Sequence, residues 1–354
     1  MKKILAFVLA IAVMLPLLAM ATVLEPSFKT NVPIKEEYPA NPLVPGFSPT
    51  TGLPFSGIYA PVLCVFDNAP NAYPHWGIGQ ADIVYQVPNM GGGATKLLAF
   101  FSDNMPEMAG GFRSARTPFV DFTFSWGASF VFAGTPGKDV KDNINVYKKL
   151  RDNGYRFDKT YFDVLGNGTY HHIEKGKRAP HNKVANIAQI QAMSLISGRT
   201  FTPQPFKFAK SEPASSILAN QINVTLYINA KERRINEPNS SYFVYDAANN
   251  AYTRTSAWGI NVDEGNREEP LLFSNVIVMR MRYDYVKSYI FLPEPLGSGR
   301  AEIFIGGKYI PGAWVRPTTE SRYIYVDEAG EEIALNPGKT FIVVVNEQAK
   351  VEYQ

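Results

Sequence analysis

Apolar residues alternate with polar ones in short runs near the middle of the N-terminal half of this 354-residue chain. Residues 81–87 form one such run, and its odd-numbered positions share one face of an extended strand because successive strand residues point to opposite faces. That face carries Ile83, Tyr85 and Val87. A second apolar run at 96–102 follows a glycine triplet at 91–93, which permits the positive φ of a tight reversal. The pattern predicts a β-hairpin over residues 81–102.

The chain after this hairpin passes through a glycine pair and reaches two arginines, Arg113 and Arg116. We expect the hairpin to deliver this two-arginine loop to the end of a sheet, and loops held by rigid scaffolds often carry function. The aromatic-rich residues 117–128 predict a short helix with Pro118 in its first turn, where proline is favoured. An apolar stripe predicts another helix at 138–150.

Strands and helices alternate through most of the first 200 residues, and the last of these helices is expected at 184–196 with Asn182 as its N-cap. The chain then becomes proline-rich and continues as short apolar runs separated by turn residues. This pattern predicts an α+β protein. An N-terminal α/β sandwich-like domain is expected at 59–200, a crossover linker at 201–222, and a smaller mostly-β domain at 223–354.

The first residues have the pattern of an export signal. Two lysines precede a long apolar run, and a small-x-small motif ends at Ala21, so residues 1–21 predict a signal peptide. An uncleaved membrane anchor is the alternative. Residues 22–58 are rich in proline and predict an extended tether. We therefore expect an exported, extracytoplasmic protein that is located in the cell envelope or secreted.

The charge balance gives no electrostatic reason to expect nucleic acid as a partner. The chain has 35 Lys and Arg residues against 32 Asp and Glu residues, a formal net charge of +3. Its single cysteine, Cys64, lies in an apolar run and cannot form a disulfide within the chain. We expect it to be a small buried hydrophobic residue.

The two arginines are the best candidates for a binding site. Arg113 and Arg116 lie three residues apart, so both guanidinium groups can converge on one anion if the chain between them turns. Asp67 and Asp82, each near the end of an expected strand, are predicted to orient these groups or to hold a cation. The alternative is structural, because buried arginines usually pair with carboxylates and such pairs would tie the loop to the sheet.

A polar stretch before residue 184 supplies further candidates. Arg178 and His181 are expected to face one cleft together with Asn182. His171 and His172 are adjacent and so point to opposite faces of a strand, and the chain has no HExxH motif or paired-cysteine spacing, so we predict no metal site. No catalytic residue is assigned. Two aromatic residues are expected to offer ring faces to a sugar: Tyr73 and Trp76.

Several short motifs occur together in residues 50–350. They are Gly52-Leu53-Pro54, Asp67-Asn68, Gly79-x-Ala81-Asp82-Ile83-Val84-Tyr85, Arg113-Ser114-Ala115-Arg116, Arg178-x-Pro180-His181-Asn182, Gly312-x-Trp314 and Asn336-Pro337-Gly338-Lys339-Thr340. In this combination the chain resembles the YerB-like exported proteins, a two-part family of unknown function. The resemblance implies a fold division and an envelope location, and it supplies no reaction.

The chain departs from the usual pattern of that family around the candidate site. Met90 stands where the family usually has an acidic residue, and Lys96 stands where it usually has arginine. Residues 132–135 read Phe-Ala-Gly-Thr in place of His-Ala-Gly-Gly. Many members are lipoproteins, whereas this chain has no cysteine at the expected cleavage site. If these positions carry chemistry elsewhere in the family, this chain binds a ligand without turning it over.

The order of elements is also similar to that of the LytR-type transferases, which move polyprenyl-phosphate-linked glycopolymers onto peptidoglycan. This similarity implies a site in which Arg113 and Arg116 clamp a pyrophosphate and Asp82 supports Mg²⁺. Two functions therefore stay open. We favour binding of an anionic or glycan-containing envelope ligand, such as peptidoglycan or an anionic wall polymer, without a cofactor. The alternative is a phosphotransferase or hydrolase that acts on polyprenyl-phosphate-linked or cell-wall polymers with Mg²⁺.

Overall fold

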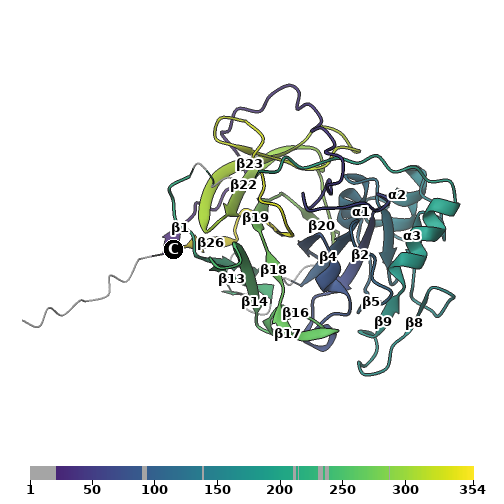
Figure 1. The fold of residues 1–354 in the computed structure, drawn as a ribbon. Coiled ribbons are helices and arrows are strands. Elements are labelled where there is room, and N and C mark those ends of the chain that lie inside the picture. Colours follow the sequence, from purple (N-terminus) through teal and green to yellow (C-terminus); the bar gives the residue numbers. More distant parts are fainter. Residues whose placement is uncertain are drawn as a thin grey trace, which may run out of the picture.

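The computed structural model of the chain describes residues 21–89, 94–137, 139–209, 213, 215–229, 234–235, 239–286 and 288–354. Ten strands form its central sheet in the order β24-β23-β22-β19-β25-β3-β4-β2-β6-β7 (Figure 1). In chain order their bounds are Val62–Asp67 (β2), Ile83–Pro88 (β3), Thr95–Phe101 (β4), Ser129–Phe132 (β6), Tyr161–Asp163 (β7), Asn275–Arg280 (β19), Gly297–Ile305 (β22), Lys308–Arg316 (β23), Ile324–Asp327 (β24) and Thr340–Val345 (β25). The expected signal peptide, except for Ala21, and the glycine triplet lie outside the described residues.

The central sheet runs through both halves of the chain. β25 pairs in parallel with β3, and Thr340 lies opposite Ile83. β19 is parallel to β25, while β6 and β7 continue in parallel beyond β2. Because β2 and β3 are both antiparallel to β4, all six of these strands point the same way. Their carboxyl ends therefore lie along one edge of the sheet, which we call the carboxyl edge.

A second sheet has the order β1-β26-β10-β13-β14-β15, with β18 beside β14. Its strands are Thr22–Val23 (β1), Gln221–Thr225 (β10), Ser241–Asp246 (β13), Ala251–Ser256 (β14), Gly259–Ile260 (β15), Leu272–Phe273 (β18) and Lys350–Tyr353 (β26). Smaller sheets pair β5 with β9 and β8, β11 with β12, β16 with β17, and β20 with β21. Their bounds are Ala109–Gly110 (β5), His171–Ile173 (β8), Lys183–Ala185 (β9), Tyr227–Asn229 (β11), Arg234–Ile235 (β12), Val262–Asp263 (β16), Asn266–Pro270 (β17), Asp284–Val286 (β20) and Tyr289–Phe291 (β21).

The helices are few and short, and local sequence signals explain where they begin. Helix α1 (Thr117–Phe124) has its proline in the first turn, as predicted. Helix α2 (Val146–Asp152) begins later than predicted because the Asn145 side chain caps it by accepting from the main-chain N–H of Lys148. The described residues also include the short 3₁₀ segments Pro70–Ala72, Ile78–Gln80 and Asp142–Ile144.

The predicted N-cap of the last helix is wrong. Helix α3 (Ile187–Ile196) is capped by Asn186, whose side chain accepts from the main-chain N–H of Gln189 at 2.8 Å. Asn182 lies before strand β9, which takes up residues that were expected to be helical. Both asparagines are good capping residues, and β-sheet pairing of Lys183–Ala185 decides between them.

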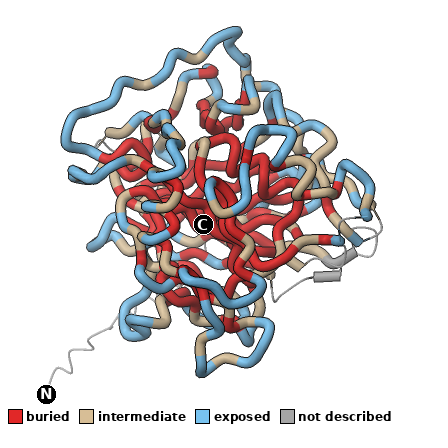
Figure 2. The backbone as a smooth tube through the Cα atoms, turned by 90° about the vertical axis from the view of Figure 1, so that its right-hand side faces the viewer, coloured by how far each residue is buried: buried red, intermediate tan, exposed pale blue. Residues whose placement is uncertain are grey.

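Both faces of the central sheet are buried (Figure 2). On one face Ile83, Tyr85 and Val87 pack with apolar side chains of α1 and α2, which confirms the predicted shared face of the hairpin strand. On the other face the strands pack against α3 and against the second sheet. Cys64 is buried on this second face, as expected. The few helices and many strands confirm the predicted α+β class with a β-rich C-terminal half.

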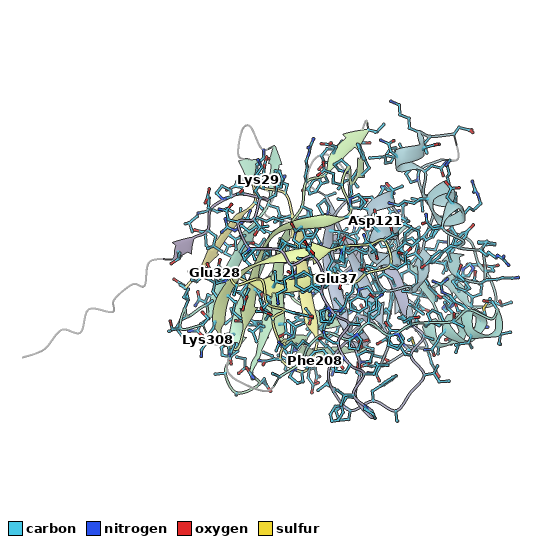
Figure 3. All side chains as sticks on the ribbon, turned by 90° about the horizontal axis from the view of Figure 1, so that it is seen from above. Lys29, Glu37, Asp121, Phe208, Lys308 and Glu328 are labelled. Atoms are coloured by element: carbon cyan, nitrogen blue, oxygen red, sulfur yellow. The ribbon has the colours of Figure 1, made fainter. Side chains whose placement is uncertain are left out.

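The first part of residues 22–58 lies against the C-terminal half, whereas Thr50 and Thr51 further along donate to Asp82 and Asp103 of the N-terminal half. β1 pairs with β26, and the main-chain N–H of Arg300 donates to the carbonyl of Phe28 at 2.9 Å. Figure 3 labels Lys29 and Glu37 of this segment and Glu328 of the C-terminal half. Lys29 and Glu328 line the same surface hollow. Within the described ranges, no helix has the length and apolar character that crossing a membrane requires.

Candidate functional site

The two-arginine loop is fixed at the carboxyl edge by main-chain hydrogen bonds. β6 pairs with β2 only along Val62–Cys64, so the last part of β2 has a side that β6 does not cover. The loop fills that side: Asp67 N–H donates to the carbonyl of Gly111, and Arg113 N–H donates to the carbonyl of Val65, both at 2.9 Å. The side chain of Arg113 therefore lies beside Asp67, the last residue of β2.

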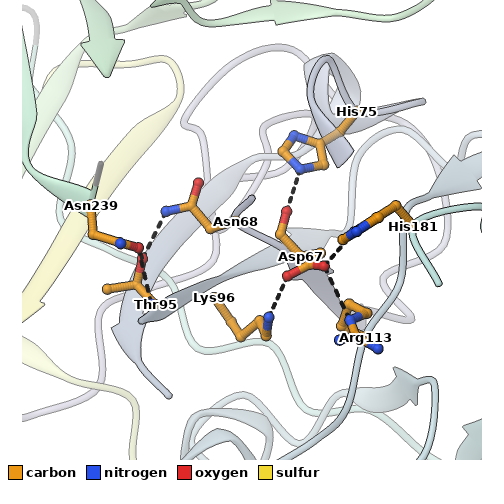
Figure 4. A network of polar contacts seen from close by, with 8 residues as sticks. All are labelled: Asp67, Asn68, His75, Thr95, Lys96, Arg113, His181 and Asn239. Carbon is orange, nitrogen blue, oxygen red and sulfur yellow. Dashed lines mark hydrogen bonds and ion pairs between the residues drawn. The ribbon is translucent and has the colours of Figure 1, made fainter. Parts of the chain in front are cut away.

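Asp67 is the centre of a cluster of basic side chains (Figure 4). Its Oδ1 atom binds the ammonium group of Lys96, which lies directly opposite on β4. Its Oδ2 atom accepts from Nε of Arg113 at 3.1 Å and contacts Nδ1 of His181 at 2.7 Å. The Asp67 side chain is only 3% exposed. Both carboxylate oxygens are thus occupied, and an ionised carboxylate only accepts, so the Nδ1 atom of His181 carries the proton.

Burial and the neighbouring charges set the pKa values of Asp67 and Lys96. Burial alone would raise the pKa of Asp67, but Lys96, Arg113 and His181 outweigh burial and lower it. Burial lowers the pKa of Lys96, and the charges of Arg113 and Arg116 lower it further against the attraction of Asp67. The single carboxylate of Asp67 therefore lies among several cations, and the cluster has an excess of positive charge.

Arg116 is a buried cation without a carboxylate partner among the described residues. It is 8% exposed. Its Nη1 atom donates to the carbonyl of Ala115 at 2.7 Å, and its guanidinium carbon lies 5.2 Å from the ring centre of Tyr289. Its Nε atom is buried and has no hydrogen-bond partner in the part of the chain that the structure describes. Burial lowers the pKa of Arg116 to about 10, with a further contribution from the charge of Arg113. A buried guanidinium is normally paired with an anion, whereas the hydrogen bond of Arg116 goes to a neutral carbonyl.

A buried histidine holds the main chain of the site. Nε2 of His75 lies 2.6 Å from the carbonyl oxygen of Asp67 and donates to it, since a carbonyl can only accept. The imidazole is buried and lies edge-on to Phe66. Burial lowers the pKa of His75 to about 4, so the ring is neutral at physiological pH.

Asp82, which was predicted to join the arginines, lies at the other end of the hairpin. Val87 of β3 lies opposite Lys96, whereas Ile83 lies opposite Phe100. Asp82 is therefore five strand residues from the Asp67 end of β4, about 17 Å at about 3.4 Å per residue. Its Oδ2 atom accepts from the main-chain N–H of Ser102 at 2.8 Å and from the hydroxyl of the same residue at 2.7 Å.

The remaining predicted residues divide between the cluster and the surface. His181 reaches Asp67 from the turn between β8 and β9, and its main-chain N–H donates to the carbonyl of Arg178. The Arg178 side chain is exposed, whereas Asn182 is buried and its Oδ1 atom has no partner among the described groups.

The Trp76 ring is buried under the Lys177 ammonium group, 4.0 Å from the ring centroid, which leaves little surface for a sugar. Tyr73 is half-buried and donates to the carbonyl of Ile260.

Sequence reasoning did not place three residues in the site: Lys96, His75 and Tyr289. Lys96 was noticed only as a departure from a family pattern, and its role follows from the β2–β4 register. Beside this pair, Asn68 donates to Thr95, and Thr95 donates to Asn239 at 2.6 Å (Figure 4). Asn239 and Tyr289 come from the C-terminal half, so both halves contribute to the site.

The fold and the cluster define a β-rich α+β protein with a positively charged site at the carboxyl edge of a sheet shared by two sequence segments. The N-terminal domain of a family described as a protein of unknown function (DUF3048) matches residues 50–201, and the C-terminal domain of the same family matches residues 232–342. The chain belongs to this YerB-like family, as the motifs predicted.

Two comparisons with YerB of Bacillus subtilis support the same relation. The chain is 27% identical to the YerB sequence of strain 168 over 293 residues, which cover 80% of this chain and 81% of that protein. The name of that relative describes it as a candidate lipoprotein. The crystal structure of the Bacillus subtilis YerB protein matches with a TM-score of 0.70 and 25% identity, over 86% of this chain and 99% of the other.

Proposed function

We propose that this protein is an exported cell-envelope protein that binds an anionic ligand at the carboxyl edge of its central sheet. The observation that carries the proposal is Arg116, a buried guanidinium that has no carboxylate partner among the described residues and lies near two other cations. The export pattern of the first residues and the lipoprotein name of YerB support the envelope location.

The cluster favours phosphate or carboxylate groups as the ligand. Arg113 donates from Nε to Asp67. Its two terminal nitrogens have no hydrogen-bond partner among the described residues, and the side chain is 34% exposed. Guanidinium groups bind such anions through two parallel hydrogen bonds. The wall polymers expected as partners carry these groups, so peptidoglycan or a phosphate-containing wall polymer is the proposed ligand class.

The proposal is tested by binding of the purified chain to inorganic phosphate and to isolated cell-wall polymer. Titration calorimetry measures the first, and co-sedimentation measures the second. The double variant Arg113→Ala/Arg116→Ala is expected to lose at least tenfold in phosphate affinity, because two charge-assisted partners are removed. The matched control is Arg151→Ala/Arg282→Ala, which removes two exposed arginines elsewhere. Equal binding by the double variant and the wild-type chain would refute the proposal.

A further inference from the structure

His181 is arranged as an acid–base group at the edge of the proposed anion site. Its Nδ1 atom donates to Oδ2 of Asp67 at 2.7 Å, which fixes the tautomer and leaves the lone pair on Nε2. Nε2 has no hydrogen-bond partner among the residues that the structure describes, and the side chain is 15% exposed. The ring is therefore held and oriented on one side and open on the other.

The same carboxylate oxygen places His181 beside the arginine that would hold the anion. Arg113 and His181 both bind Oδ2 of Asp67, so their side chains lie next to each other (Figure 4). A phosphate group on the terminal nitrogens of Arg113 would lie within reach of Nε2 of His181, directly or through one water molecule. Base, orienting carboxylate and phosphate-binding cation are the parts that hydrolysis needs.

We propose that His181 is the general base of a phosphoanhydride hydrolysis, which rests on the anion site proposed above. Nε2 takes a proton from a water molecule as the water oxygen bonds to phosphorus. The P–O bond to the leaving phosphate breaks, its electron pair stays on the leaving oxygen, and the His181 proton passes to solvent. Arg113 and Arg116 stabilise the charge on the transferred phosphoryl group. Asp67 is a positioning residue, since it orients the imidazole without touching the substrate.

The substrate class depends on whether Asp67 can protonate the leaving group. Asp67 is ionised and its oxygens are occupied by basic groups, so it cannot protonate a leaving group. A phosphate leaves as a stable anion, whereas an alkoxide requires protonation. The geometry therefore favours a pyrophosphate linkage over a simple alkyl phosphate ester.

The test measures hydrolysis and binding on the same samples of the purified full chain. Inorganic pyrophosphate is the substrate probe, methyl phosphate is the poor-leaving-group comparison, and ³¹P NMR follows the products. His181→Asn keeps an amide donor near the position of Nδ1 and removes the base. It is expected to bind phosphate within threefold of the wild-type affinity and to hydrolyse pyrophosphate at least 100-fold more slowly. His172→Asn, on the exposed side of β8, is the matched control and should keep the wild-type rate.

The outcomes separate this inference from the proposed function. Phosphate binding without pyrophosphate hydrolysis by the wild-type chain would overturn the base role and leave the anion site standing. Loss of both would overturn both. Equal rates for His181→Asn and wild type would also overturn the role, and rapid hydrolysis of methyl phosphate would overturn the substrate class. His181→Gln, which lacks the donor near Nδ1, is the second variant and is expected to be as slow as His181→Asn.

Discussion

The imidazole of His75 donates from Nε2 to the main-chain carbonyl of Asp67, 2.6 Å away. This bond fixes the end of β2 independently of the cations around the Asp67 side chain. It also places a neutral histidine in a fully buried position, where protonation is unfavourable.

The first prediction concerns the pH dependence of stability. The pKa of His75 is about 4 in the folded protein against an ordinary value of 6.5, so the unfolded chain binds the extra proton between these values. The contribution of His75 to stability should therefore fall by about 3 kcal/mol as the pH falls from 6.5 to about 4. Urea unfolding at several pH values measures the slope. His75→Gln keeps a donor for the carbonyl of Asp67 and should flatten the slope, with His172→Gln as the matched control.

The second prediction ranks two substitutions in the buried pair of Asp67 and Lys96. Asp67→Asn leaves the Lys96 ammonium buried without its carboxylate and should cost about 3–5 kcal/mol. Lys96→Met should cost less, about 1–3 kcal/mol, because Arg113 still neutralises Asp67 and His181 still donates to it. Urea unfolding at pH 7 measures both. Lys96→Arg keeps the charge and is the control. A Lys96→Met variant less stable than Asp67→Asn would contradict the ranking.

The sequence predicted the elements that depend on local chemistry. The hairpin follows from alternation and turn residues, and α1 follows from the proline in its first turn. Local signals failed where tertiary pairing decided the outcome. Asn182 and Asn186 are equivalent as capping residues, and only the pairing of β9 with β5 and β8 shows which of them precedes the helix.

The sequence could predict the candidate site only in part. Asp67, Arg113 and His181 were selected for their chemistry, and the structure brings them together. Asp82 was selected for the same reason, yet it lies at the amino end of β3, opposite the carboxyl edge. Each aspartate is next to a strand, but Asp67 ends β2 and Asp82 precedes β3, and these strands run in the same direction. Which strand ends share an edge depends on strand order and direction, which the sequence alone does not reveal.

The third prediction concerns Gly110, which lies where β5 meets β9. A Cβ atom on this residue would be 2.3 Å from the carbonyl oxygen of Lys183, so an alanine forces the two strands apart. Gly110→Ala should cost about 1–3 kcal/mol and should weaken phosphate binding, because the next residue, Gly111, accepts from the main-chain N–H of Asp67 and anchors the loop that carries Arg113. Urea unfolding and calorimetry measure the two effects. Gly166→Ala, where a Cβ atom would meet open space, is the control and should change neither.

The fourth prediction is that the two halves of the chain fold as one unit. β25 pairs with β3 along Ile83–Gln86, and the buried Arg254 donates to the Gln86 side chain at 2.9 Å. A fragment of residues 22–201 would expose this edge of β3 and the apolar face that packs against the second sheet. We expect the fragment to aggregate or to unfold without a cooperative transition, whereas the full chain melts in one step. Circular dichroism melts and size-exclusion chromatography measure both. A full chain cut within residues 201–222 is the control and should stay associated. A fragment with its own sharp transition would show that the N-terminal half folds independently.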